Sequence, residues 1–170
     1  MNKTLFTENL QKNQLLVTRT FNSQLSLVWD SWTNSDLLTK WWSSEGYKCV
    51  TKSMDFREGG DWFYYMEEVS TGNRHWGKIN YLKIILKKSF EATHSFCDEQ
   101  GLINPDIPSA HWDIQFNKVP NGTEVWAMHT FNSAKEMRTY IEMGAKEGTQ
   151  VAYGLLDQLL IELIEAGTNK

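Results

Sequence analysis

Near its C-terminal end the chain carries the stretch VAYGLLDQLLIELIEA, residues 151–166, which decides the fold. It completes a segment in which apolar residues recur with helical spacing, at positions 137, 141, 145, 152, 155, 159 and 163. Ser133 and Glu136 fit a capping box, which marks where a helix begins. Gly144 and Gly148 interrupt the pattern, and each costs about 1 kcal/mol relative to alanine inside a helix. We therefore expect one long amphipathic helix whose first turns are broken.

The residues before this helix follow mainly the two-residue period of strands. A first strand is predicted at 14–21, and two short helices follow it at 25–32 and 35–42, the first capped by Asn22 or Ser23. Six further strands are predicted at 47–56, 60–69, 74–84, 87–97, 110–119 and 123–131. This order is typical of an α+β protein. We expect one domain over residues 1–170, with a core at about 13–165, in which a curved antiparallel sheet of about six to seven strands wraps around the C-terminal helix.

Charge and composition exclude several classes of protein. The 17 basic and 21 acidic side chains give a net charge of −4, which argues against a sequence-blind nucleic-acid binder. No apolar run is long enough for a membrane helix, and residues 1–16 lack the apolar core of a signal peptide. Cys49 and Cys97 give no disulfide framework, so we expect both to be reduced. These features predict a cytoplasmic protein with neither nucleic acid nor membrane as partner.

Sequence motifs of catalysis and metal binding are absent, so no catalytic residue, metal or cofactor is assigned. His111 and Asp113 share a strand face, but alternation turns them outward because Trp112 and its neighbours point inward. His129 also lies on a predicted strand, at 123–131. It is either a hydrogen-bonded core residue or a group that contacts a ligand.

Aromatic residues are dense, with eight Trp, eight Phe and six Tyr. They indicate either a heavily packed core or a cavity with flat walls. The strand at 60–69 is apolar on both faces, with Trp62, Tyr64 and Met66 on one face and Phe63 and Tyr65 on the other. If their strands are neighbours, Trp126 and Met128 join them in an apolar patch. Such a patch favours a homodimer, although cross-strand packing explains it equally well.

The chain resembles the START-like, or helix-grip (SRPBCC), superfamily and, within it, bacterial proteins similar to the C-terminal domain of the Hsp90 ATPase activator. The resemblance covers about residues 13 to 165. It departs from the family at Ser43-Ser44, where a proline is common. The matching segments are 18–21, Val28-Trp29, 38–42, 55–62, Gly77, 122–125 and 154–159.

The resemblance implies a hydrophobic cavity between the curved sheet and the C-terminal helix, which binds a small hydrophobic or aromatic molecule. The residues expected to line it are Trp41, Trp62, Tyr64, Met66, His94, Phe96, Ile114, His129, Met143 and Tyr153. Two alternatives stay open. The first is a chaperone-interacting protein of the stress response, similar to the Hsp90 activator. The second, which we favour less, is a cyclase or dehydratase that acts on a polyketide and uses His129 or Tyr64 as its acid or base.

Overall fold

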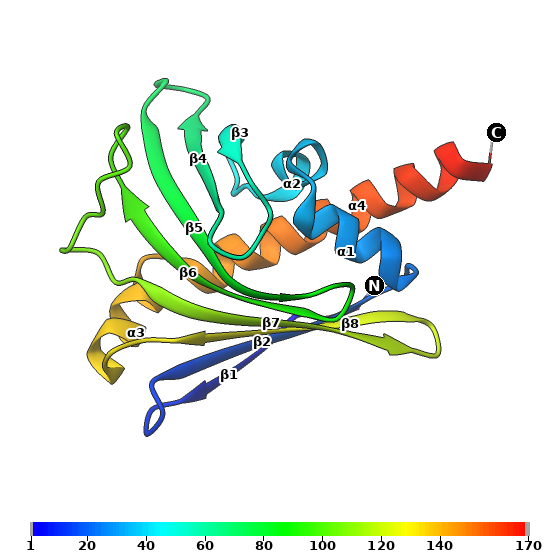
Figure 1. Cartoon of the computed structure of the whole chain (residues 1–170), viewed down its shortest axis with the longest axis horizontal. Coiled ribbons are helices and arrows are strands. Elements are labelled where there is room, and N and C mark those ends of the chain that lie inside the picture. Colours follow the sequence, from blue (N-terminus) through cyan, green and yellow to red (C-terminus); the bar gives the residue numbers. More distant parts are fainter. Residues whose placement is uncertain (1, 169–170) are drawn as a thin grey trace.

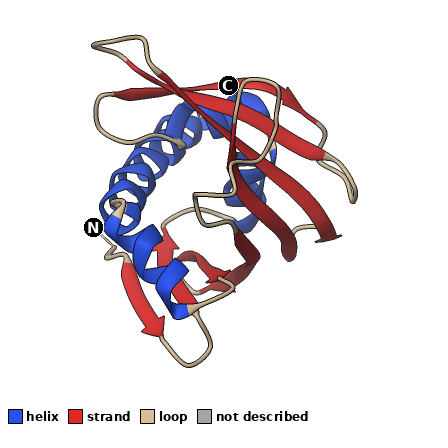
Figure 2. Ribbon diagram, turned by 90° about the vertical axis from the view of Figure 1, so that its left-hand side faces the viewer, coloured by secondary structure: helices blue, strands red, loops and turns tan. Residues whose placement is uncertain are grey.

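The computed structural model describes residues 2–168 and contains one antiparallel sheet with helices on its inner side (Figure 1). The sheet bends around these helices, as Figure 2 shows in a view turned by a quarter of a revolution. The elements in chain order are β1 (Leu5–Asn9), β2 (Gln14–Phe21), α1 (Leu25–Thr33), α2 (Ser35–Trp41), β3 (Tyr47–Met54), β4 (Asp61–Glu68), β5 (Arg74–Ile85), β6 (Ser89–Cys97), β7 (Ala110–Val119), β8 (Gly122–Thr130), α3 (Ala134–Glu142) and α4 (Ala145–Thr168).

The strand order across the sheet is β1-β2-β8-β7-β6-β5-β4-β3. The chain leaves β2 near one edge, passes through α1 and α2, and returns as β3 at the opposite edge. This confirms the predicted α+β architecture, with two short helices between the strand at 14–21 and the rest of the sheet. The strand count is higher than the predicted six to seven, because the sheet has eight strands. The additional strand is β1, in which only Phe6 is partly buried, so its sequence lacks the alternation that marks a strand.

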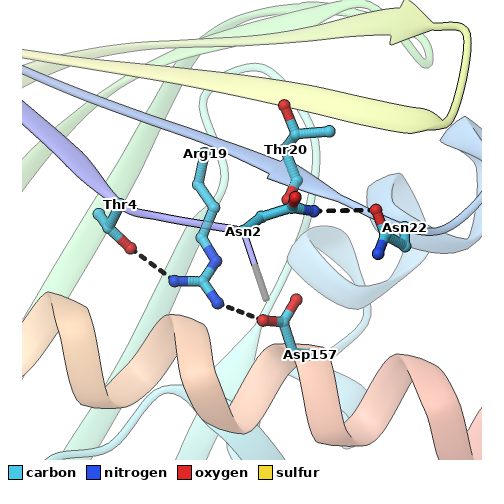
Figure 3. Close-up of polar contacts among 6 residues, drawn as sticks. All are labelled: Asn2, Thr4, Arg19, Thr20, Asn22 and Asp157. Carbon is cyan, nitrogen blue, oxygen red and sulfur yellow. Dashed lines mark hydrogen bonds and ion pairs between the residues drawn. The ribbon is translucent and has the colours of Figure 1, made fainter.

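A buried polar cluster holds β1 and β2 against α4 (Figure 3). The Arg19 guanidinium is only 4% exposed and donates a hydrogen bond of 2.7 Å to Thr4 Oγ1. It also forms an ion pair with Asp157 of α4. Close by, the Asn2 side chain donates to the backbone oxygen of Thr20 at 2.7 Å. The edge strand is therefore fixed by side-chain contacts to its neighbours in addition to its backbone ladder.

Helices α1 and α2 pack against each other at one end of the sheet. The Trp41 indole N–H donates to the backbone oxygen of Ser31 at 2.8 Å, which ties α2 to α1. Asn34 caps α2 by accepting from the Asp36 N–H at 2.9 Å. The residue that precedes α1 is Gln24, and it provides no side-chain cap, so the predicted capping by Asn22 or Ser23 is wrong.

The C-terminal helical segment is divided in two, as the glycine pattern predicts. Ser133 caps α3, since its Oγ accepts from the Glu136 N–H at 3.1 Å, and the Glu136 carboxylate accepts from the Asn132 N–H at 3.1 Å. Between α3 and α4, Gly144 has a φ of +93°, which favours glycine because it has no Cβ. The long helix α4 begins only after this turn. None of the described helices is long and apolar enough to cross a membrane.

The outer face of the sheet carries a smaller aromatic group than predicted. Phe63 and Tyr65 contact Trp76 of β5, with ring centroids 5.0 and 4.7 Å apart, and the Arg74 guanidinium lies 4.4 Å from the Tyr65 ring centre. Residues 126 and 128 do not join them, because β5, β6 and β7 separate β4 from β8. The prediction of one patch across both strands is therefore wrong.

Candidate ligand-binding cavity

A cavity of about 400 Å³ lies between the concave face of the sheet, the residues around α2, and the facing ends of α3 and α4. Strands β4, β6, β7 and β8 supply its floor. Trp32, Trp41 and Trp42 close one side, and Met143 and Gly144 close another at the turn between the last two helices. The cavity therefore lies where the helix–sheet arrangement predicts it.

Nine of the ten residues predicted to line the cavity do line it. They come from six elements and from the turn before α4: Trp41, Tyr64, Met66, His94, Phe96, Ile114, His129, Met143 and Tyr153. Trp62 is the exception and corrects the prediction. Its side chain faces inward but is completely buried, stacked on Tyr64 with ring centroids 4.1 Å apart. Its indole N–H donates to Thr51 Oγ1 at 2.9 Å, so it supports the wall from behind.

Trp42 was missing from the predicted set, although it is central to the aromatic wall. It directly follows α2, and its ring contacts Trp112 at 5.5 Å, Tyr64 at 6.3 Å and Trp62 at 5.7 Å between centroids. Trp112 also lines the cavity, as its inward position beside Ile114 could have indicated. Tyr140 of α3 is a third addition.

Most of the α4 residues that line the cavity are small. Ala145, Gly148, Thr149 and Ala152 follow each other at helical spacing along the first turns of α4, and all four line the cavity. A Cβ placed on Gly148 would have no heavy atom within 4 Å apart from its own helix and neighbours. Open space therefore begins at the backbone of this residue.

Tyr64 and His94 form a buried polar pair in the cavity wall. The phenol oxygen lies 3.0 Å from the His94 Nε2, and each residue is only 4% exposed. Gly77 on the adjacent strand makes room for this phenol, since a Cβ there would lie 2.5 Å from Cζ and 2.6 Å from the hydroxyl oxygen. Burial raises the pKa of Tyr64 far above its usual value, and burial together with nearby His129 lowers the pKa of His94 to about 3. Both groups are neutral at pH 7.

His129 lies between aromatic rings, 5.4 Å from Trp112 and 6.1 Å from Tyr140 between centroids. Burial lowers its pKa to about 4. Its Nδ1 is covered by protein and has no hydrogen-bond partner among residues 2–168. Of the two readings that the sequence left open, a fully hydrogen-bonded core histidine is therefore wrong.

Two further phenols complete the polar groups of the cavity. Burial raises the pKa of Tyr140 to about 12 and raises that of Tyr153 further. Both residues line the cavity. Because their pKa values are raised, both phenols are protonated at neutral pH, and each hydroxyl can donate a hydrogen bond.

His111 points away from the cavity, as the alternation of its strand predicts. His111 has 42% of its side chain exposed and lies 3.4 Å from a Glu91 carboxylate oxygen on the outer face of the sheet. Both cysteines are free thiols. Within the described part of the chain, no group of three or more His, Cys, Asp or Glu residues could hold a metal ion.

The profile of one protein family, described as Activator of Hsp90 ATPase homolog 1-like protein, matches residues 22–161. The chain belongs to this family. The match covers both short helices, most of the sheet and most of α4, and it confirms the resemblance seen in the sequence. No protein with a curated description matches significantly.

Solved structures of bacterial proteins share the fold. A solution NMR structure of a protein from Arthrobacter aurescens is 23% identical, with a TM-score of 0.87 over 93% of this chain and 91% of that one. Protein Ms6760 from Mycobacterium smegmatis is 24% identical, with a TM-score of 0.85 over 93% and 97%. The AHSA1 protein from Silicibacter pomeroyi is 19% identical, with a TM-score of 0.69 over 87% and 97%. At these identities the likeness establishes the helix-grip fold.

Proposed function

We propose that this protein of the Activator of Hsp90 ATPase homolog 1-like family binds a small hydrophobic or aromatic molecule in the cavity, as a cytoplasmic protein. The observation that carries the proposal is the cavity itself, at about 400 Å³ and with largely aromatic walls. Ligand pockets fall in this range of volume and combine apolar walls with a few polar groups. The Tyr and His side chains of the wall supply those polar groups.

The composition of the wall supports a binding role over a packing role. Protein cores are close-packed, with few voids larger than a water molecule. Besides Tyr153, the residues of α4 that line the cavity are the small ones Ala145, Gly148, Thr149 and Ala152, where a larger apolar side chain would fill the space. Gly148 also lowers the stability of the helix by about 1 kcal/mol relative to alanine. A binding function explains why the helix keeps small residues at this face.

Catalysis is the weaker alternative at this site. A general acid or base works best when its pKa lies near the pH at which the enzyme operates. Burial moves the pKa of His94 and His129 well below 7 and that of Tyr64 well above it. These groups are therefore suited to hydrogen bonding in their neutral forms, and binding remains the better proposal. A chaperone partner is named by the family description, but no feature of the cavity requires one.

The test uses two glycines of the same helix. Gly148 lines the cavity, whereas Gly154 does not, and both have open space where a Cβ would be. We expect the neutral naphthalene dye PRODAN to bind the parent protein at about one site per chain, with a blue-shifted emission. Gly148→Leu should abolish this binding because the new side chain enters the cavity. Gly154→Leu should leave it intact.

Thermal unfolding of both variants shows whether the fold survives. Gly148→Ala and Gly154→Ala should each raise the free energy of unfolding by about 1 kcal/mol, since alanine is the better helix former. No dye binding to the parent protein, or equal binding to Gly148→Leu and the parent, would contradict the proposed function.

A further inference from the structure

The wall of the cavity contains no charged side chain. Among the described residues that line it there is no Lys, Arg, Asp or Glu. The buried Arg19 acts electrostatically on Tyr153 but does not line the cavity, and it is already paired with Asp157. His75 lies at the mouth of the cavity, exposed to solvent beside Tyr47. A charged ligand inside the cavity would therefore lose its hydration without gaining a countercharge.

Several polar groups of the wall can donate hydrogen bonds. Tyr140 and Tyr153 line the cavity as neutral phenols, since burial raises the pKa of both hydroxyls. The covered Nδ1 of His129 has no partner in the described protein, so a proton there would be buried without an acceptor. The stable neutral tautomer therefore carries its proton on Nε2. Tyr140, Tyr153 and His129 all line the cavity and can each donate, so a ligand with an acceptor oxygen has donors available in this wall.

We infer that the ligand is an uncharged aromatic molecule with a carbonyl or similar acceptor oxygen, and that the cavity rejects the carboxylate of the same shape. This inference rests on the proposed function and specifies its ligand class. The aromatic part is favoured because the rings of Trp42, Trp112 and Tyr64 offer edges and faces to a flat molecule. The acceptor oxygen is placed toward Tyr140 and Tyr153, and the desolvation cost of an unpaired charge excludes the anion.

The experiment compares three molecules with the same two rings: naphthamide, naphthoate and methylnaphthalene. Each molecule is titrated into the complex of the parent protein with PRODAN at neutral pH. The loss of the blue-shifted emission gives its dissociation constant, and the three constants are compared. Naphthamide should bind at least about thirtyfold more tightly than naphthoate, because several kcal/mol of desolvation remain uncompensated for the anion. Naphthoate that binds as tightly as naphthamide overturns the inference, while the proposed function still stands. Failure of all three molecules and of the dye overturns the proposed function itself.

The acceptor part is tested with variants that remove one hydroxyl and keep the ring. In Tyr140→Phe or Tyr153→Phe, naphthamide should bind about tenfold more weakly, and methylnaphthalene, which has no acceptor, should bind as before. Tyr65→Phe, on the outer face of the sheet, is the matched control and should change neither constant. If both cavity variants leave the ratio of naphthamide to methylnaphthalene affinity unchanged, the assignment of an acceptor oxygen is wrong.

Discussion

Mild acid should destabilise the protein through its two cavity histidines. The pKa of His94 falls to about 3 and that of His129 to about 4 in the folded protein, from an ordinary value of 6.5. Since both folded-state values are lowered, the unfolded chain binds more protons than the folded one once the pH falls below 6.5. The free energy of unfolding is therefore highest above this pH, decreases on acidification, and stops decreasing for each residue below its folded pKa.

The size of the effect follows from linkage. At about pH 5 both imidazoles are still neutral in the folded protein and almost fully protonated in the unfolded chain. Each histidine then lowers the free energy of unfolding by about 2 kcal/mol, or about 4 kcal/mol for the pair. Exposed carboxylates contribute little at this pH, because most of them titrate closer to pH 4.

Urea denaturation at about pH 7.5 and pH 5 measures this loss. His129→Phe should reduce the pH dependence by about half, since one of the two buried imidazoles is gone. His111→Gln, on the exposed outer face, is the control and should retain the full dependence. If the parent protein has the same free energy of unfolding at both pH values, the imidazoles accept protons inside the fold. That result would refute both the neutral cavity and the ligand class inferred from it.

Two further predictions concern residues that hold the site in place. Gly77→Ala should lower the free energy of unfolding by about 2 kcal/mol and break the Tyr64–His94 hydrogen bond, because the new Cβ would lie 2.5 Å from the phenol ring. Urea denaturation of Gly77→Ala, compared with that of the parent protein and of Tyr64→Phe, measures this loss. An unchanged free energy of unfolding in Gly77→Ala contradicts the prediction. Arg19→Met should cost about 3 kcal/mol by leaving Asp157 without its partner. Adding Asp157→Asn to Arg19→Met should recover part of this loss, and a purely additive double variant would show that the two side chains are not coupled.

Most of the fold could be predicted because its signal is repeated along the chain. Each of the seven predicted strands begins and ends within two residues of its observed position. In β2, for example, every second residue is buried, so one face of the strand is specified by several residues together. The strand β1 could not be predicted in this way. Its position depends on the Thr4–Arg19 contact and on pairing with β2, which are visible only in three dimensions.

Alternation predicts the face of a side chain but not what lies in front of it. Trp62 and Tyr64 both point inward from β4, yet only Tyr64 reaches the cavity. The difference comes from Trp42, whose ring lies 5.7 Å from that of Trp62, and from the stacking of Trp62 on Tyr64. The position of Trp42 is set by the end of α2, where its ψ of 76° leaves helical geometry. The alternation of residues in β4 therefore cannot predict which of its inward side chains lines the cavity.

The chemistry of the ligand is harder to predict than the cavity, because it depends on a few atoms and not on a pattern. In the sequence, His129 is one residue of a strand, and its pattern favours a hydrogen-bonded core histidine slightly over a group that contacts a ligand. The structure separates them through a single nitrogen, the covered Nδ1 without a partner. The role of Tyr140 also depends on tertiary packing, which brings its ring to 6.1 Å from that of His129 between centroids. Removing one hydroxyl or one charge at a time, with the fold held constant, therefore tests the function more directly than any larger change to the sheet or the helix.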